Sequence, residues 1–163
     1  MPRDSQRSKV YAAEHFVRTL FDRAAERGTR AVDFFGAQLT LPPEARFAST
    51  DSVRGYVDEV MALPSVRSRW PEAEPLTVRP RRGVSAAHYE YDGGVAAIAV
   101  PDRESTWTLR ELVVLHEVAH HLCRCDPPHG PGFTAALCEL TETVMGPEVG
   151  HVLRVTYAKE GVR

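Results

Sequence analysis

Two histidines and a glutamate in one short stretch carry the clearest chemistry in this sequence. His116 and His120 flank Glu117 in the pattern H-E-x-x-H, within the segment LRELVVLHEVAHHLCRCDPPHGPGF. Residues four apart on an α-helix lie one turn apart on the same side, so two imidazoles there can close around one metal ion. Glu117 would lie beside an open coordination position, where a carboxylate can accept a proton from water and pass it to a leaving group. The pattern therefore predicts a zinc ion used for hydrolysis.

A catalytic zinc usually has a third protein ligand, and three residues compete for that place. Asp126 follows His120 by six residues, as in metzincin-like motifs, but Cys123 stands where those motifs have a turn-forming glycine. Glu139 has the separation typical of gluzincins, yet the apolar stripe of the helix predicted there leaves it on a flank. His129 lies in the turn CDPPHGPGF, which is expected to bring the chain back beside the helix that carries H-E-x-x-H. We favour His129. Asp126 would then support a ligand without binding the metal, or help to form the turn.

The composition is that of an ordinary globular protein. The 163 residues carry a formal charge of -2, with 43% hydrophobic and 26% charged residues, so no strong attraction to nucleic acid is expected. The amino-terminal segment has no apolar signal-like core, and no stretch is long enough to span a bilayer. We therefore expect a cytoplasmic protein without a membrane partner. Oligomeric state leaves no mark in the sequence.

The cysteines do not suggest a disulfide framework. The chain has three, of which Cys123 and Cys125 are separated by a single residue. This number and spacing agree with a reducing compartment, so we expect free thiols at both positions. Cys138 lies within an apolar helical pattern and is expected to pack as a small hydrophobic residue.

The elements that must position the site follow from hydrophobic periodicity. Predicted helices cover residues 10–24, 53–61, 112–122, 132–145 and 149–157, and predicted strands lie on both sides of Gly36 and at 76–79, 85–91 and 95–100. Thr50 or Asp51 is expected to cap the second helix, and Thr108 with Glu111 forms a capping-box pattern before the site helix. Asp92-Gly93-Gly94 predicts a tight hairpin whose last strand, Val95 to Val100, runs toward that helix.

Beyond the motif, the sequence resembles an actinobacterial family of zinc metallohydrolases over most of its length. The resemblance rests on VVLHEVAHHL followed by HGPGF, and on RDSQRSKVYAAE, FFGAQLTLP and RFASTDSVRGYV upstream. HGPGF is also similar to the H-G-x-x-F of SprT-like minimal zinc proteases. Both resemblances imply zinc on His116, His120 and His129, with Glu117 as the base. The short spacing between the histidines and the lack of a basic or zinc-ribbon tail differ from the SprT-like kind, so DNA-associated proteolysis is not expected.

These observations predict one α+β domain over residues 1–163. We expect a compact zincin-like metalloprotease domain, with a small mixed or antiparallel sheet beside the helix that carries H-E-x-x-H. The expected function is a zinc-dependent metallopeptidase, whose peptide or protein substrate could add to an exposed strand edge. One alternative is a non-catalytic module with a structural or sensory zinc, in which Cys125 or Asp126 would be the fourth ligand. Another is a zinc hydrolase of non-peptide amides or esters.

Overall fold

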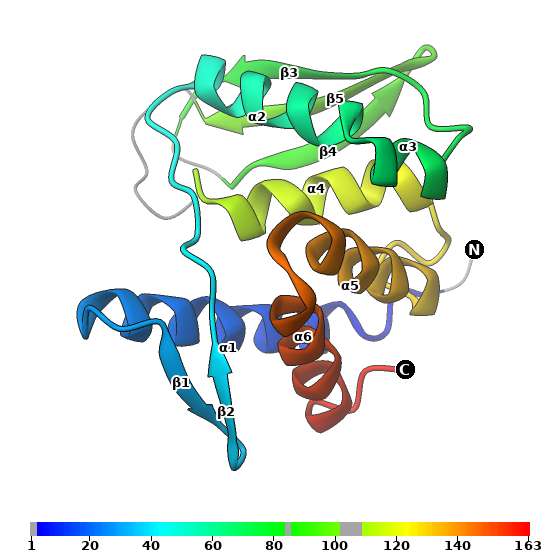
Figure 1. Ribbon diagram of the computed structural model, residues 1–163. Coiled ribbons are helices and arrows are strands. Elements are labelled where there is room, and N and C mark those ends of the chain that lie inside the picture. Colours follow the sequence, from blue (N-terminus) through cyan, green and yellow to red (C-terminus); the bar gives the residue numbers. More distant parts are fainter. Residues whose placement is uncertain (1–2, 84–85, 102–108) are drawn as a thin grey trace. The chain divides into compact units, whose positions relative to one another are not determined.

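The computed structural model describes residues 3–83, 86–101 and 109–163. Its internal contacts divide the chain into two compact units. The terminal unit comprises Met1–Glu44 and Arg124–Arg163, and the central unit comprises Ala45–Cys123. Both contain helices and strands, so the α+β class is confirmed (Figure 1). The single domain expected over residues 1–163 stays a prediction.

In its described residues, the terminal unit is built from three helices and a hairpin. Its elements are α1 (Arg7–Glu26), β1 (Ala31–Phe34), β2 (Ala37–Thr40), α5 (Pro131–Met145) and α6 (Pro147–Lys159). Helix α6 packs against both α1 and α5, and the apolar stripes of the three helices are buried. Helix α1 ends where the sequence predicts, before Gly28 with a φ of 65°, and Gly36 turns the hairpin with a φ of 83°. These predicted elements are confirmed.

The central unit holds a three-stranded sheet and the helix with the H-E-x-x-H pattern. Its elements are α2 (Thr50–Ala62), α3 (Pro64–Arg69), β3 (Leu76–Arg81), β4 (His88–Asp92), β5 (Val95–Pro101) and α4 (Glu111–Cys123). The strand order is β3-β5-β4, with β5 parallel to β3 and antiparallel to β4, so the sheet is mixed. Helix α2 packs along β3, whereas α4 contacts β4 and β5. The hairpin between β4 and β5 turns at Gly93 and Gly94, as predicted.

The sheet order decides which strand edge lies beside α4. Strand β5 leads along the chain toward α4, as expected, but it is the central strand and is paired on both sides. The outer strand that contacts α4 is β4. The outer edge on this side of the sheet therefore belongs to β4 and not to β5.

The start of α2 differs from the predicted cap. Ser49, not Thr50 or Asp51, caps α2: its hydroxyl accepts from the Ser52 amide at 3.1 Å, and the Ser52 hydroxyl accepts from the Ser49 amide at 3.1 Å. The reason is that Ser49 is the last residue with extended backbone, as a cap requires. Thr108, expected to open the capping box before α4, lies outside the described residues.

The start of α4 is tied to the segment that precedes α2. The buried carboxylate of Glu111 accepts from the Ala45 amide at 3.1 Å and from the Tyr56 hydroxyl. The Glu111 amide donates to the Ala45 carbonyl at 3.0 Å. Most of α4 is buried on all sides, more than the single apolar face that the periodicity predicts. Its polar side chains therefore lie in a largely dry environment.

Candidate metal centre

Helix α4 brings His116 and His120 together, as the i, i+4 spacing predicts. Their Nε2 atoms lie 3.1 Å apart and their ring centroids 4.8 Å apart, with the ring planes at 72°. Two nitrogen ligands about 2.05 Å from a tetrahedral zinc are separated by roughly 3.3 Å. The two nitrogens therefore already lie at nearly the separation that a shared metal ion requires, and the donor set fits zinc.

Glu117 lies between these histidines in the sequence and faces strand β4. Its carboxylate accepts a hydrogen bond from the Tyr89 amide at 2.7 Å, and only 8% of the residue is exposed. Because the amide belongs to the outer strand of the sheet, the bond fixes the carboxylate beside that strand's edge. A carboxylate in this setting can accept and return a proton without being surrounded by bulk water.

His129 is held within the terminal unit by residues near the start of the chain. Its Nδ1 atom lies 2.8 Å from an Asp4 carboxylate oxygen, and its carbonyl accepts from the Gln6 side chain at 2.9 Å. The rings of Tyr11 and Phe133 lie 5.2 and 5.1 Å from the imidazole, which is 5% exposed. With Nδ1 on the carboxylate, Nε2 is the atom that a metal ion would meet. This pairing is the usual support of a metal-binding histidine.

The three candidates for the third ligand differ in burial and in their neighbours. Among the residues that it describes, His116, His120 and His129 form a group of side chains that could hold a metal ion. That group does not include Asp126, which is exposed, or Glu139, which is half-buried on α5. The three-histidine ligand set itself, and zinc as its metal, stay predictions.

The cysteines differ from expectation. Cys123 and Cys125 are disulfide-bonded, so the prediction of free thiols at these positions is wrong. Arg124 between them has a φ of 46°, so the chain turns sharply just after α4. Cys138 is buried on α5, as expected, and burial raises the pKa of its thiol to about 11. None of the three thus offers a thiolate near neutral pH.

Several residues around the site were not identified from the sequence. Asp4, Glu74 and Tyr89 carry no recognisable motif. His121 directly follows the predicted ligand His120, is 2% exposed and contacts both Tyr89 and Glu74. The only signal for Asp4 was its place in the RDSQRSKVYAAE segment, because contacts between distant segments have no local pattern.

A hollow of about 850 Å³ lies elsewhere in the central unit, between the end of α2, α3 and the approach to β3. Trp70, Met61 and Pro75 contribute apolar walls, and Arg67 and Glu74 contribute charge. None of the predicted metal ligands lines it, and neither does Glu117. The hollow is therefore separate from the candidate metal centre.

Searches of family models, of curated proteins and of solved structures found no match to this chain. Within the described part of the chain, no helix has both the length and the apolar character needed to cross a membrane. The functional interpretation therefore depends on the residues and their geometry.

Proposed function

We propose that this chain is a zinc-dependent hydrolase, and most specifically a metallopeptidase of zincin-like fold. One observation carries the proposal: the Nε2 atoms of His116 and His120 converge at 3.1 Å, with the buried carboxylate of Glu117 on the residue between them. Two converging imidazoles with an adjacent carboxylate match the needs of metal-assisted hydrolysis, which combines a metal ion with a nearby base.

His129 is proposed as the third ligand. It follows His120 by only nine residues, so the connecting turn limits how far apart the two imidazoles can be. The Asp4 carboxylate orients the ring so that Nε2 is the ligand atom. A zinc ion on these three histidines would supply a Lewis acid that polarises a carbonyl and makes water more acidic.

Glu117 is proposed as the base. Its carboxylate would take a proton from the attacking water and deliver it to the departing amine, so that one group serves both halves of the reaction. The 2.7 Å bond from the Tyr89 amide supports this role, because it holds the carboxylate in a fixed orientation on the helix that carries His116 and His120.

A peptide substrate is favoured by the position of β4. This outer strand pairs with β5 along one edge, and the Tyr89 amide on its other edge is bonded to Glu117. An extended peptide that added alongside β4 would run close to the base. Hydrolysis of a non-peptide amide or ester remains the second candidate, since the same base and metal would serve it.

A purely structural zinc is less well supported. Such a site needs a fourth protein ligand and no base. Cys125, one proposed fourth ligand, is disulfide-bonded, and Asp126, the other, is exposed. Burying the Glu117 carboxylate costs free energy, and in a structural zinc site this carboxylate would have no role that offsets the cost.

The test combines metal analysis with Glu117→Gln, which keeps an oxygen to accept from the Tyr89 amide. Protein purified without added metal is expected to contain about one zinc per chain, in both wild type and variant. Wild type should cleave members of a mixed peptide library, and Glu117→Gln should be slower by roughly 10²- to 10⁴-fold. Zinc-free wild type would contradict the proposal. Equal cleavage by the variant would contradict the role of Glu117, and zinc-loaded protein inert to peptides would shift the substrate to another amide or an ester.

A further inference from the structure

Tyr89 on strand β4 touches three parts of the candidate metal centre at once. Its amide donates to the Glu117 carboxylate at 2.7 Å. Its hydroxyl lies 3.2 Å from Nδ1 of His121. Its ring lies nearly parallel to that of His120, with an angle of 13° and a centroid separation of 6.5 Å. One side chain and its own backbone thus face the proposed base, a proposed ligand and the histidine that follows this ligand.

The other contact of His121 shows which group donates in the hydrogen bond between Tyr89 and His121. Its Nε2 atom lies 2.7 Å from the Glu74 carbonyl oxygen, which can only accept a hydrogen bond. In the neutral imidazole Nε2 therefore carries the hydrogen, and Nδ1 presents its lone pair to the Tyr89 hydroxyl. Since His121 is 2% exposed, bulk water does not compete for these bonds. The resulting chain runs from the Tyr89 hydroxyl through His121 to the backbone just before β3.

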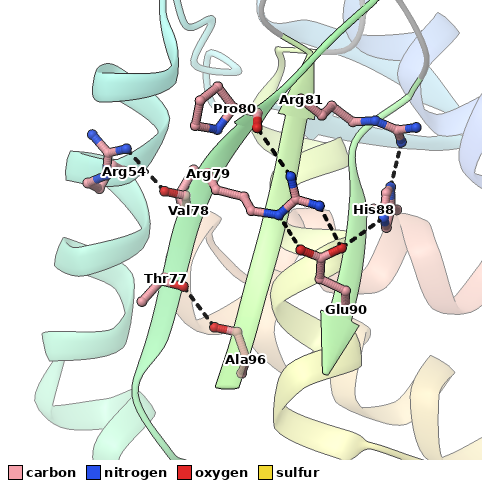
Figure 2. Close-up of polar contacts among 9 residues, drawn as sticks. All are labelled: Arg54, Thr77, Val78, Arg79, Pro80, Arg81, His88, Glu90 and Ala96. Carbon is pink, nitrogen blue, oxygen red and sulfur yellow. Dashed lines mark hydrogen bonds and ion pairs between the residues drawn. The ribbon is translucent and has the colours of Figure 1, made fainter. Parts of the chain in front are cut away.

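His88 and Glu90, the neighbours of Tyr89 on β4, make their contacts on the face of the sheet that points away from α4. Arg79 on β3 reaches across β5 and donates to Glu90 through Nε and, at 2.9 Å, through Nη2 (Figure 2). His88 contacts Glu90 at 3.3 Å and Arg81 through its other ring nitrogen (Figure 2). Side chains alternate between the faces of a strand, so these contacts leave the Tyr89 side chain on the face toward α4.

We propose that Tyr89 and His121 are positioning residues for Glu117. The buried His121 imidazole holds the Tyr89 hydroxyl, the Tyr89 backbone is thereby kept against α4, and its amide keeps the Glu117 carboxylate in one orientation. This inference rests on the proposed function, in which Glu117 is the base. Neither residue is assigned a contact with substrate or metal, and both act through Glu117.

The direct readout is the exchange rate of the Tyr89 amide, measured by NMR in a ¹⁵N-labelled full-length chain. Tyr89→Phe removes only the hydroxyl. His121→Gln can keep a donor toward Glu74, but its one acceptor, the amide oxygen, does not occupy the position of Nδ1 that faces the Tyr89 hydroxyl. Each variant should raise exchange at residue 89 by roughly fivefold, the effect of one lost buried hydrogen bond, and the double variant should add little more. Tyr91→Phe, two residues along the same strand, is the matched control and should leave exchange at residue 89 unchanged.

Three outcomes decide the matter. Faster exchange confined to residue 89, with the amides of the β4–β5 ladder unchanged, supports the proposal. Unchanged exchange at residue 89 in the folded variants overturns it, and so does a uniform increase along β4, which would mark Tyr89 as a general packing residue. Zinc content, measured on the same samples, separates this result from the proposed function: zinc-free wild type contradicts the function, whereas the exchange data test the positioning contact alone.

Discussion

The Nδ1 atom of His129 lies 2.8 Å from a carboxylate oxygen of Asp4, although the two residues are 125 positions apart in the sequence. The pair is enclosed by the terminal unit, with 7% of the His129 side chain and 24% of the Asp4 side chain exposed. A carboxylate on one ring nitrogen directs the other toward a metal ion and strengthens it as a ligand. The start of the chain would thereby take part in the proposed zinc site.

Asp4→Asn tests this support. The amide keeps the size of the side chain but removes its charge, so we expect metal affinity to fall by roughly 10- to 100-fold. The affinity is measured by competition with a chromophoric chelator. Asp51→Asn is the matched control, because its side chain is 89% exposed at the start of α2 and the same charge is lost. Equal affinities for wild type and Asp4→Asn would show that the pair does not support a ligand.

Substitution of the three candidate ligands tests the proposed set. Zinc content should be lost in His129→Ala and kept near one per chain in Asp126→Ala and Glu139→Ala. The reason is that His129 is buried and oriented, whereas Asp126 is exposed. Elemental analysis of protein purified without added metal gives the answer. Loss of zinc with Asp126→Ala or Glu139→Ala instead would assign the third ligand to that residue.

Thiol chemistry tests the assignment of the cysteines. The native protein should show one slowly reacting thiol toward an aromatic disulfide reagent, and the reduced and unfolded protein should show three. The slow thiol is Cys138, whose pKa of about 11 leaves little thiolate near pH 8. Its rate should rise about tenfold per pH unit until the pH nears that pKa, because the thiolate fraction rises in this way. Cys138→Ala should remove the slow reaction, and two further thiols in the native protein would contradict the disulfide assignment.

The start of the site helix depends on the buried carboxylate of Glu111. Glu111→Ala leaves the Ala45 amide and the Tyr56 hydroxyl without this acceptor, so the free energy of unfolding should fall by about 1–3 kcal/mol. Urea unfolding provides the measurement. Glu59→Ala, an exposed position on α2, is the control for loss of a helical glutamate and should change stability by less than about 0.5 kcal/mol. Similar losses in the two variants would show that the buried contacts contribute little.

The local parts of this fold followed from the sequence. Helix α4, the hairpin at Gly93-Gly94 and the helix starting at Pro131 lie where periodicity and turn residues predict them. The predicted cap of α2, Thr50 or Asp51, lies one or two residues too late, because Ser49, Thr50 and Asp51 are all good caps and only the backbone distinguishes them. The prediction of free thiols at Cys123 and Cys125 is wrong. The number and spacing of three cysteines do not show which pair of sulfur atoms comes close enough to bond.

What the sequence determined by itself is the pair His116 and His120 with Glu117 beside them, since a helix places residues i and i+4 on one side whatever surrounds it. Only the tertiary structure decided that β4 is the strand against Glu117, that Tyr89 supplies the amide, and that Asp4 orients His129. The physical reason is distance along the chain. Periodicity records contacts within one element, whereas these hydrogen bonds join residues 28 and 125 positions apart, which only packing of the whole chain brings together.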